Sequence, residues 1–177
     1  MKTWLSSAKI YTDGRILVIL FLGFSSGLPL LLVFSTLSAW LRSDGVEVAA
    51  IGFFAWIGML YSIKFFWAPV VDRLALPLMT RVFGQRRGWM LLAQGMIAAG
   101  LVGLAGLSPV GNLGWVAVFA LLVAFGSATQ DIAIDAYRLE IADDQRQAAL
   151  AASYMAGYRV AALLATAGAL FFAEWFG

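Results

Sequence analysis

The sequence has 177 residues, of which 62% are hydrophobic and 12% are charged, and its mean hydropathy is +0.87. A soluble domain averages about 45–50% apolar and about 25% charged residues, so much of this surface requires lipid as its solvent. The chain contains no cysteine and no histidine, which excludes disulfides, thiolate chemistry and the common metal sites, and we expect no cofactor. The formal charge of +2 is too small to indicate a nucleic-acid partner.

Apolar segments of about 20 residues are typical of transmembrane helices, and five such segments follow one another along the chain. After a leader at 1–15, the sequence predicts a transmembrane domain over 16–177. Its helices are expected at about 16–40, 49–67, 88–107, 113–136 and 147–173. The expected fold is therefore an all-α, multi-pass membrane protein whose main partner is the lipid bilayer.

Basic residues alternate between the two ends of these helices. They occur in the leader, the second loop and the fourth loop: Lys2, Lys9, Arg15, Arg73, Arg81, Arg86, Arg87 and Arg146. The first loop contains only Arg42, and the third loop contains no basic residue. Because cytoplasmic loops carry the excess of Lys and Arg, this pattern predicts a cytoplasmic N-terminus.

In the first helix, Pro29 lies near the middle of the membrane, close to Ser25 and Ser26. Proline removes a backbone hydrogen bond, and at this depth the freed carbonyl needs protein or cavity water as its partner. Two interpretations are open: a broken helix of the kind that forms transporter binding sites, or a kink that serves packing. On the first interpretation all three residues are candidates for the wall of a cavity.

The second helix and the loop that follows it carry charges. Lys64 lies about one turn inside the cytoplasmic end, where it either extends to the interface or pairs with Asp131 at a similar depth. The loop is charged at both of its ends, by Asp72, Arg73, Arg86 and Arg87. A basic loop is expected from topology alone, but the added Asp72 suggests a charge network that latches helix ends in one conformation.

In the fourth helix, Asp131 and Asp135 lie about 40° apart on the helix surface and Arg138 falls between them, so the three share one face. Asp135 and Arg138 are compatible with ordinary interfacial charges, whereas Asp131 is about one turn inside the boundary. Neighbouring carboxylates in a low dielectric resist simultaneous ionisation, and a basic neighbour stabilises the ionised one. The pair is therefore a candidate for proton coupling.

The fifth helix contains Arg159 about 18 Å from its cytoplasmic end, close to the middle of the membrane. An arginine there needs a partner, and we expect Asp131, Asp135 or an anionic group of a substrate. The alternative is a buried ion pair that only stabilises packing. Small residues at fourfold spacing indicate close helix packing in the same segment: Gly157, Ala161, Ala165 and Ala169.

Six motifs along the chain resemble the AmpG-type muropeptide permeases of the major facilitator superfamily. They are "GFSSGLPLLL", "IGFFAWIG", "KFFWAPVVDR", "GQRRGWMLLAQ", "SATQDIAIDAY" and "GYRVA". The resemblance covers essentially the whole chain. It implies a proton-driven importer of anhydro-muropeptides, the sugar-peptide products of cell-wall turnover, in the bacterial inner membrane.

The resemblance also implies functional residues. Helices one and four would face a central cavity, which adds Gln130 to Ser25, Ser26, Pro29, Lys64 and Arg159 as substrate candidates. The four charged residues of the second loop would form the gating signature of the superfamily, although Ala68 replaces its glycine and about ten extra residues separate its halves. Superfamily transporters have two six-helix halves. We therefore expect an N-terminal fragment that lacks its C-terminal half, or a partial protein that pairs with a separate chain.

Three other functions remain as alternatives. One is an acetyl-coenzyme A carrier of the same superfamily, for which a phosphate-rich cargo would require more arginines than Arg159. Another is an intramembrane Mg²⁺-dependent prenyltransferase, because two aspartates four residues apart suit that cation. Such enzymes need a second acidic cluster, and the nearby pair Asp143–Asp144 lies in the adjoining loop. The third is an assembly subunit without cargo.

Overall fold

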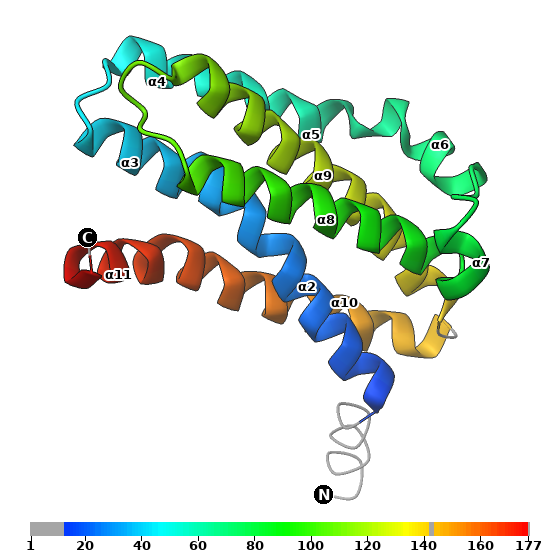
Figure 1. The fold of residues 1–177 in the computed structure, drawn as a ribbon. Coiled ribbons are helices and arrows are strands. Elements are labelled where there is room, and N and C mark those ends of the chain that lie inside the picture. The colour runs from blue at the N-terminus through cyan, green and yellow to red at the C-terminus, as the bar shows by residue number, and fades with distance from the viewer. Residues whose placement is uncertain (1–12, 142–143, 177) are drawn as a thin grey trace, which may run out of the picture.

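The computed structural model describes residues 13–141 and 144–176, and within these ranges every regular element is a helix (Figure 1). Five helical segments are long and apolar enough to cross a membrane: Gly14–Ser43, Val48–Phe66, Gln85–Ala105, Leu113–Glu140 and Arg146–Trp175. The predicted all-α membrane fold with five transmembrane helices is confirmed. Most of the predicted leader at 1–15, including Lys2 and Lys9, lies outside the described residues.

The first span combines α2 (Gly14–Leu31), the π-helical turn η1 (Leu32–Thr36) and α3 (Leu37–Ser43). The Asp13 side chain caps its start by accepting a hydrogen bond of 3.0 Å from the Arg15 amide. Pro29 lies inside α2 and supplies no amide to the helix, yet the chain stays helical on both sides of it. The structure therefore does not show a broken helix at Pro29; the helix continues and widens into a π-helical turn after it.

The remaining spans differ in regularity. The second is interrupted by 3₁₀ turns and consists of α4 (Val48–Phe54), η2 (Ala55–Gly58), α5 (Met59–Ile63) and η3 (Lys64–Phe66). Two short helices, α6 (Ala68–Arg73) and α7 (Met79–Phe83), connect the second span to the third. The third and fourth spans are the single helices α8 (Gln85–Ala105) and α9 (Leu113–Glu140). The fifth consists of α10 (Asp144–Leu163), the π-helical turn η4 (Leu164–Gly168) and α11 (Ala169–Phe176).

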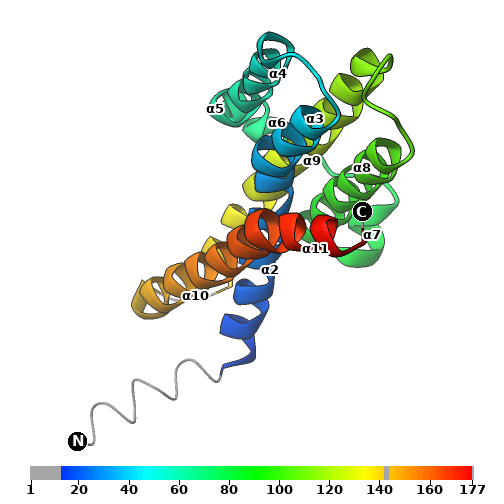
Figure 2. The ribbon, with the colours of Figure 1, turned by 90° about the vertical axis from the view of Figure 1, so that its left-hand side faces the viewer.

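Glycine residues bring α2 and α10 into backbone contact, and Figure 2 shows these two helices crossing. A Cβ atom at Gly157 would collide with the Leu20 carbonyl, and one at Gly23 would collide with the carbonyl of Tyr154. Ala161 and Ala165 extend the buried row on the same helix. These residues thus serve the packing that their fourfold spacing predicts, because close approach replaces the hydrophobic effect between helices in lipid.

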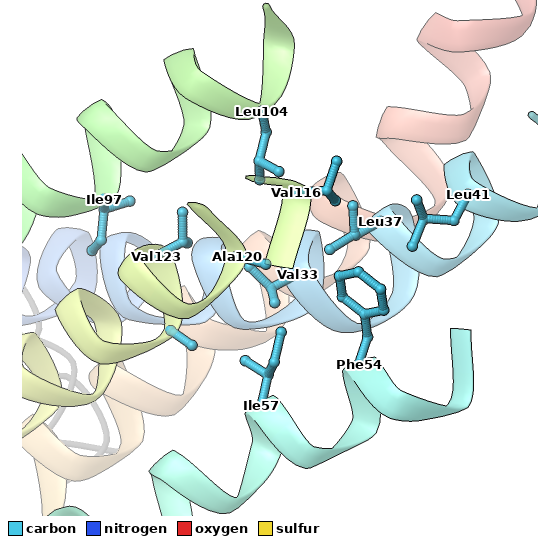
Figure 3. Close-up of a cluster of buried hydrophobic side chains, with 11 residues drawn as sticks. Val33, Leu37, Leu41, Phe54, Ile57, Ile97, Leu104, Val116, Ala120 and Val123 are labelled. Carbon is cyan, nitrogen blue, oxygen red and sulfur yellow. The ribbon is translucent and has the colours of Figure 1, made fainter. Parts of the chain in front are cut away.

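An apolar core fills the bundle between its first four spans (Figure 3). Val33 of the first span, Ile57 of the second, Ile97 of the third and Val123 of the fourth belong to this core and are at most 7% exposed. The opposite face of the second span is exposed and aromatic, with Phe53, Trp56, Phe65 and Phe66. Such a surface suits contact with lipid tails.

The starts of α2, α8 and α10 and the end of α9 gather with α6 and α7 at one end of the bundle (Figure 1). We call this the α7 end. Hydrogen bonds hold it together: the Arg15 guanidinium donates to the Ile141 carbonyl at 2.9 Å, and Arg146 pairs with Asp13 at 2.8 Å. The loops after α3 and α8 form the other end.

Candidate functional site

Asp131 lies inside the bundle, where α9 faces α2 and η3. Its side chain is 15% exposed, and both of its oxygens have partners. Oδ1 accepts a hydrogen bond from the Ser26 hydroxyl, and Oδ2 lies 3.4 Å from the Lys64 ammonium. Of the two positions that the sequence allows for Lys64, extension to the interface or contact with Asp131, the structure shows the contact. Three spans therefore meet at one carboxylate.

The Asp131 carboxylate also interacts with tyrosines of two further elements. The Ser26 hydroxyl lies 2.9 Å from the Tyr154 hydroxyl of α10. Since a serine hydroxyl has a single proton, which Ser26 donates to Asp131, Tyr154 is the donor in this second bond. Tyr61 of α5 and Tyr158 of α10 lie close enough to the carboxylate to interact with it electrostatically. The site thus combines one buried carboxylate, one ammonium and several neutral hydroxyl groups.

A second polar cluster lies on the other side of α2. Gln130 and Gln94 donate hydrogen bonds to the Ser25 hydroxyl at 3.1 and 3.5 Å. With Pro29, these residues line a largely apolar cavity of about 280 Å³ between α2, α8 and α9. Gln130 is fully buried, and its Oε1 accepts no hydrogen bond from the described residues. Ser25 and Ser26 reach different clusters because consecutive residues on a helix point about 100° apart.

Asp135 and Arg138 pair with each other rather than with the Asp131 site. Their side chains approach to 3.6 Å across one helical turn, and that of Asp135 is 49% exposed. The Arg138 guanidinium also lies 5.6 Å from the centre of the Tyr154 ring, within the range of a cation–π contact. The two aspartates predicted as a proton-coupling pair thus differ in environment, with Asp131 inside the bundle and Asp135 half-buried near the α7 end.

Arg159 does not reach either aspartate. Its side chain is exposed on α10, and it forms no ion pair or hydrogen bond with the part of the chain that the structure describes. The expectation that Asp131 or Asp135 pairs with Arg159 is therefore wrong. The reason is rotation about the helix axis: Gly157 faces α2, and a residue two positions later points about 200° away from it. Lys64 takes the place at Asp131 that depth alone suggested for Arg159.

A charge network joins three helix ends at the α7 end of the bundle. The Arg86 guanidinium lies 2.6 Å from Asp72 and 2.9 Å from Glu140, so it connects the end of α6 and the start of α8 to the end of α9. Gln85 strengthens the same contact by donating to the Asp72 carbonyl at 2.6 Å. The charge network expected around Asp72 is present in this form.

The other two residues expected in this network remain apart from it. Arg73 and Arg87 are exposed, and neither forms an ion pair within the described ranges. Glu140, which the sequence argument did not include, supplies the second carboxylate. A lone acidic residue at the end of the fourth helix, on the same side as a basic loop, is the signal that identifies it. Gln94 and Tyr154 were also overlooked, although polar side chains deep within the third and fifth spans are the same kind of signal.

The geometry does not favour a diphosphate-binding metal site. Among residues 13–141 and 144–176, no three acidic side chains come together in a way that fits a metal ion. Asp131 and Asp135 each contact a different cation, Lys64 and Arg138. The predicted loop pair Asp143–Asp144 lies outside the residues whose side chains are described.

Five apolar spans around an ion pair inside the bundle define a multi-pass membrane protein, and intramembrane charges of this kind are typical of transporters. The comparison with protein families agrees. A sequence model described as acetyl-coenzyme A transporter 1 matches residues 15–109, which is more than half of the chain. The chain belongs to this family of transporters.

Curated relatives confirm the resemblance to AmpG-type proteins. The chain is 38% identical over 166 residues to a protein named putative transporter AmpG 4 of Rickettsia conorii, covering 94% of this chain and 40% of that protein. It is 38% identical over 170 residues to the anhydromuropeptide permease of Escherichia coli K12, covering 96% of this chain and 34% of that one. The chain thus spans well under half the length of these relatives.

Proposed function

We propose that this chain forms part of a proton-coupled secondary transporter that imports anhydro-muropeptides across the bacterial inner membrane. The name of one relative, an anhydromuropeptide permease, supports this cargo. The observation that carries the proton coupling is the buried Asp131 carboxylate, which Ser26 and Lys64 contact from two other spans. Ionisable groups inside a membrane bundle mark ion pathways and proton relays by default.

In this proposal Asp131 changes its interactions when it takes up a proton. The ionised carboxylate attracts the Lys64 ammonium and accepts the Ser26 hydroxyl bond. The neutral carboxyl group no longer attracts Lys64 by charge, so the contact between η3 and α9 weakens. Two protonation states thus favour two arrangements of the second and fourth spans, which is the differential interaction that a conformational change requires. Asp135, half-buried near the α7 end, is the candidate for passing protons to that end.

We also propose that the α7 end faces the cytoplasm and that the Arg86 network holds this end closed in one conformation. The support for orientation is charge: Arg15, Arg73, Arg81, Arg86 and Arg146 belong to this end, whereas the opposite end carries Arg42 alone among the described residues. An excess of basic residues is typical of cytoplasmic loops. Because the sequence contains no cysteine, single Arg81→Cys and Ser108→Cys variants allow a clean test. A membrane-impermeant thiol reagent added to intact cells should label only the second variant.

The transporter in this proposal contains more helices than the five described. The relatives are more than twice as long as the matched segment, which supports a second group of helices, on the same polypeptide or on a separate chain. We refer to this chain together with those helices as the complete permease. The proposed cargo pathway lies between the two groups.

Uptake into proteoliposomes tests the function directly. With the complete permease and an inward proton gradient, labelled anhydro-muropeptide should accumulate, and an uncoupler should abolish its accumulation. An Asp131→Asn variant should lose accumulation against a gradient, because its side chain cannot exchange a proton. Uptake that persists unchanged with the uncoupler, or in Asp131→Asn, would refute proton coupling.

The second candidate cargo is acetyl-coenzyme A, which the description of the matching family favours. The described cations argue against it, since Lys64 beside Asp131 and Arg159 in the middle part of the fifth span are only two candidate cations. A phosphate-rich cargo requires several such groups. Labelled acetyl-coenzyme A in the same vesicles decides between the two: uptake of it, with none of the muropeptide, would replace our proposal.

A further inference from the structure

Lys64 is the least constrained member of the Asp131 site. Its ammonium group is held at 3.4 Å by one carboxylate oxygen, whereas charge-assisted hydrogen bonds are usually about 2.7–2.9 Å long. Its side chain is 33% exposed, compared with 15% for Asp131. An ammonium has three donors, and Asp131 is the one acceptor that Lys64 contacts among the described residues. Two donors therefore remain for another ligand.

The backbone around Lys64 is also suited to movement. Lys64 begins the 3₁₀ turn η3, and the preceding residue, Ile63, departs from α-helical geometry with φ −99° and ψ 6°. Such turns inside a helix often mark hinges, because their hydrogen bonds are weaker than those of an α-helix. A shift of Lys64 away from α9 therefore does not require breaking a regular helix.

The other ionisable groups around Asp131 leave Lys64 as its sole counter-ion. Tyr61 of α5 and Tyr154 and Tyr158 of α10 are the titratable groups near the carboxylate, and a tyrosine cannot supply a positive charge. On α9 itself, Asp135 is paired with Arg138. No other cation within the described ranges lies within ion-pair distance of Asp131. A proton that binds to Asp131 therefore leaves the Lys64 ammonium without a compensating charge.

We infer that Lys64 is the residue that binds a carboxylate group of the cargo, and that Asp131 and the cargo compete for it. A proton binds to Asp131 Oδ2, the ion pair opens, and the ammonium, which keeps all its protons, binds the cargo carboxylate instead. Loss of the proton restores the pair and expels the cargo. The inference rests on the proposed function, since the peptide part of an anhydro-muropeptide ends in a carboxylate.

The first test compares two cargoes of similar size and shape, one with charged carboxylates and one with neutral carboxamides. Labelled anhydro-muropeptide and its derivative with carboxamides in place of carboxylates are offered to the complete permease in proteoliposomes. The wild type should show a KM about tenfold or more lower for the carboxylate form, because a hydrogen bond to a charged group contributes about 1.5–3 kcal/mol, equivalent to at least a tenfold change. Lys64→Gln should bring the ratio of the two KM values to about one, and Lys64→Arg should retain part of the preference. Arg81→Gln, at an exposed residue of α7, is the matched control for loss of one positive charge.

The second test measures binding and does not need Lys64→Gln to fold. In the wild type, lowering the pH from about 8 to about 6 should tighten binding of the carboxylate cargo, by at most tenfold per pH unit for a single linked proton. Asp131→Asn should bind it tightly at both pH values, because Lys64 is already free.

The results of these tests distinguish a failure of the inference about Lys64 from a failure of the proposed function. If Lys64→Gln keeps the wild-type preference, or if Asp131→Asn keeps the wild-type pH dependence, the inference is overturned while muropeptide transport stands. If the wild type takes up neither cargo above the level of empty vesicles, the proposed function fails and the inference fails with it.

Discussion

Two charge clusters of this protein contain the same kinds of groups in different surroundings. At the α7 end, Arg86 bridges Asp72 and Glu140, whose side chains are 46% and 54% exposed. Inside the bundle, Lys64 meets Asp131 at a longer distance; the Asp131 side chain is only 15% exposed, although Lys64 at 33% is more exposed than Arg86 at 19%. Exposed ion pairs contribute about 0–1 kcal/mol each, whereas removing one partner of a buried pair costs about 3–5 kcal/mol. The shorter contacts therefore belong to the cluster that contributes less to stability. The burial of the carboxylate, rather than the distance between the charges, decides how much each cluster contributes.

Separating α10 from α2 should have the largest effect on stability and should disrupt the cluster around Asp131. Gly157→Val places a side chain against the Leu20 backbone, where nothing can yield, so Tyr154 should lose its bond to Ser26. We expect destabilisation of about 3 kcal/mol or more, at the upper end for overpacking. Thermal unfolding of the detergent-solubilised protein measures it. Gly95→Val on α8 is the control, because its Cβ would meet open space; similar melting curves for both variants would contradict the packing argument.

Neutralising one partner of the buried pair should have the next largest effect. Asp131→Asn leaves Lys64 without a counter-ion, and since Lys64 is one-third exposed we expect a loss of about 2–3 kcal/mol, below the full cost of breaking a buried pair. Asp72→Asn at the α7 end is the comparison and should cost about 1 kcal/mol or less. The double variant Asp131→Asn with Lys64→Gln should recover part of the loss. Additive losses in the double variant would show that the two side chains are not coupled.

The contribution of the α7-end network to stability should decrease at high salt, because its two carboxylates are exposed. Arg86→Gln removes two ion pairs and should cost about 1 kcal/mol at low ionic strength and less at about 1 M salt, where the Debye length is about 3 Å. Arg87→Gln is the adjacent control and should change little, because Arg87 is exposed and forms no ion pair among the described residues. Equal losses for the two arginines, or a loss for Arg86→Gln that salt does not reduce, would argue against the network.

The smallest change is expected at Gln130. Its amide donates to Ser25, but its Oε1 lies buried without a donor among the described residues. Gln130→Leu removes one hydrogen bond and also one unsatisfied oxygen, so the two effects should nearly cancel and leave stability within about 1 kcal/mol of the wild type. Gln94→Leu, which removes only a long hydrogen bond, is the matched comparison. A melting temperature well below that of the wild type for Gln130→Leu would indicate that Oε1 has a partner.

Much of the fold was predictable from the sequence, because membrane insertion depends on local properties. Each span required only about 20 apolar residues, and the row from Gly157 to Ala165 indicated close packing before any partner was known. The polar residues were harder. Asp131 and Lys64 were identified by depth, yet Gln94, Tyr154 and Glu140 were passed over because each is an isolated polar residue within or at the end of an apolar helix.

What the sequence by itself determined is how many transmembrane spans these residues form, roughly where they lie and which side chains are placed too deep for water to solvate. Those properties depend only on the composition of short stretches of neighbouring residues. Which charge meets which was decided only by tertiary structure. Arg159 and Lys64 were both plausible partners for Asp131 by depth, and the crossing of α10 over α2 turned one away while η3 brought the other to within 3.4 Å. Pairing depends on the rotation and crossing of helices, and these arise from contacts between segments more than 60 residues apart.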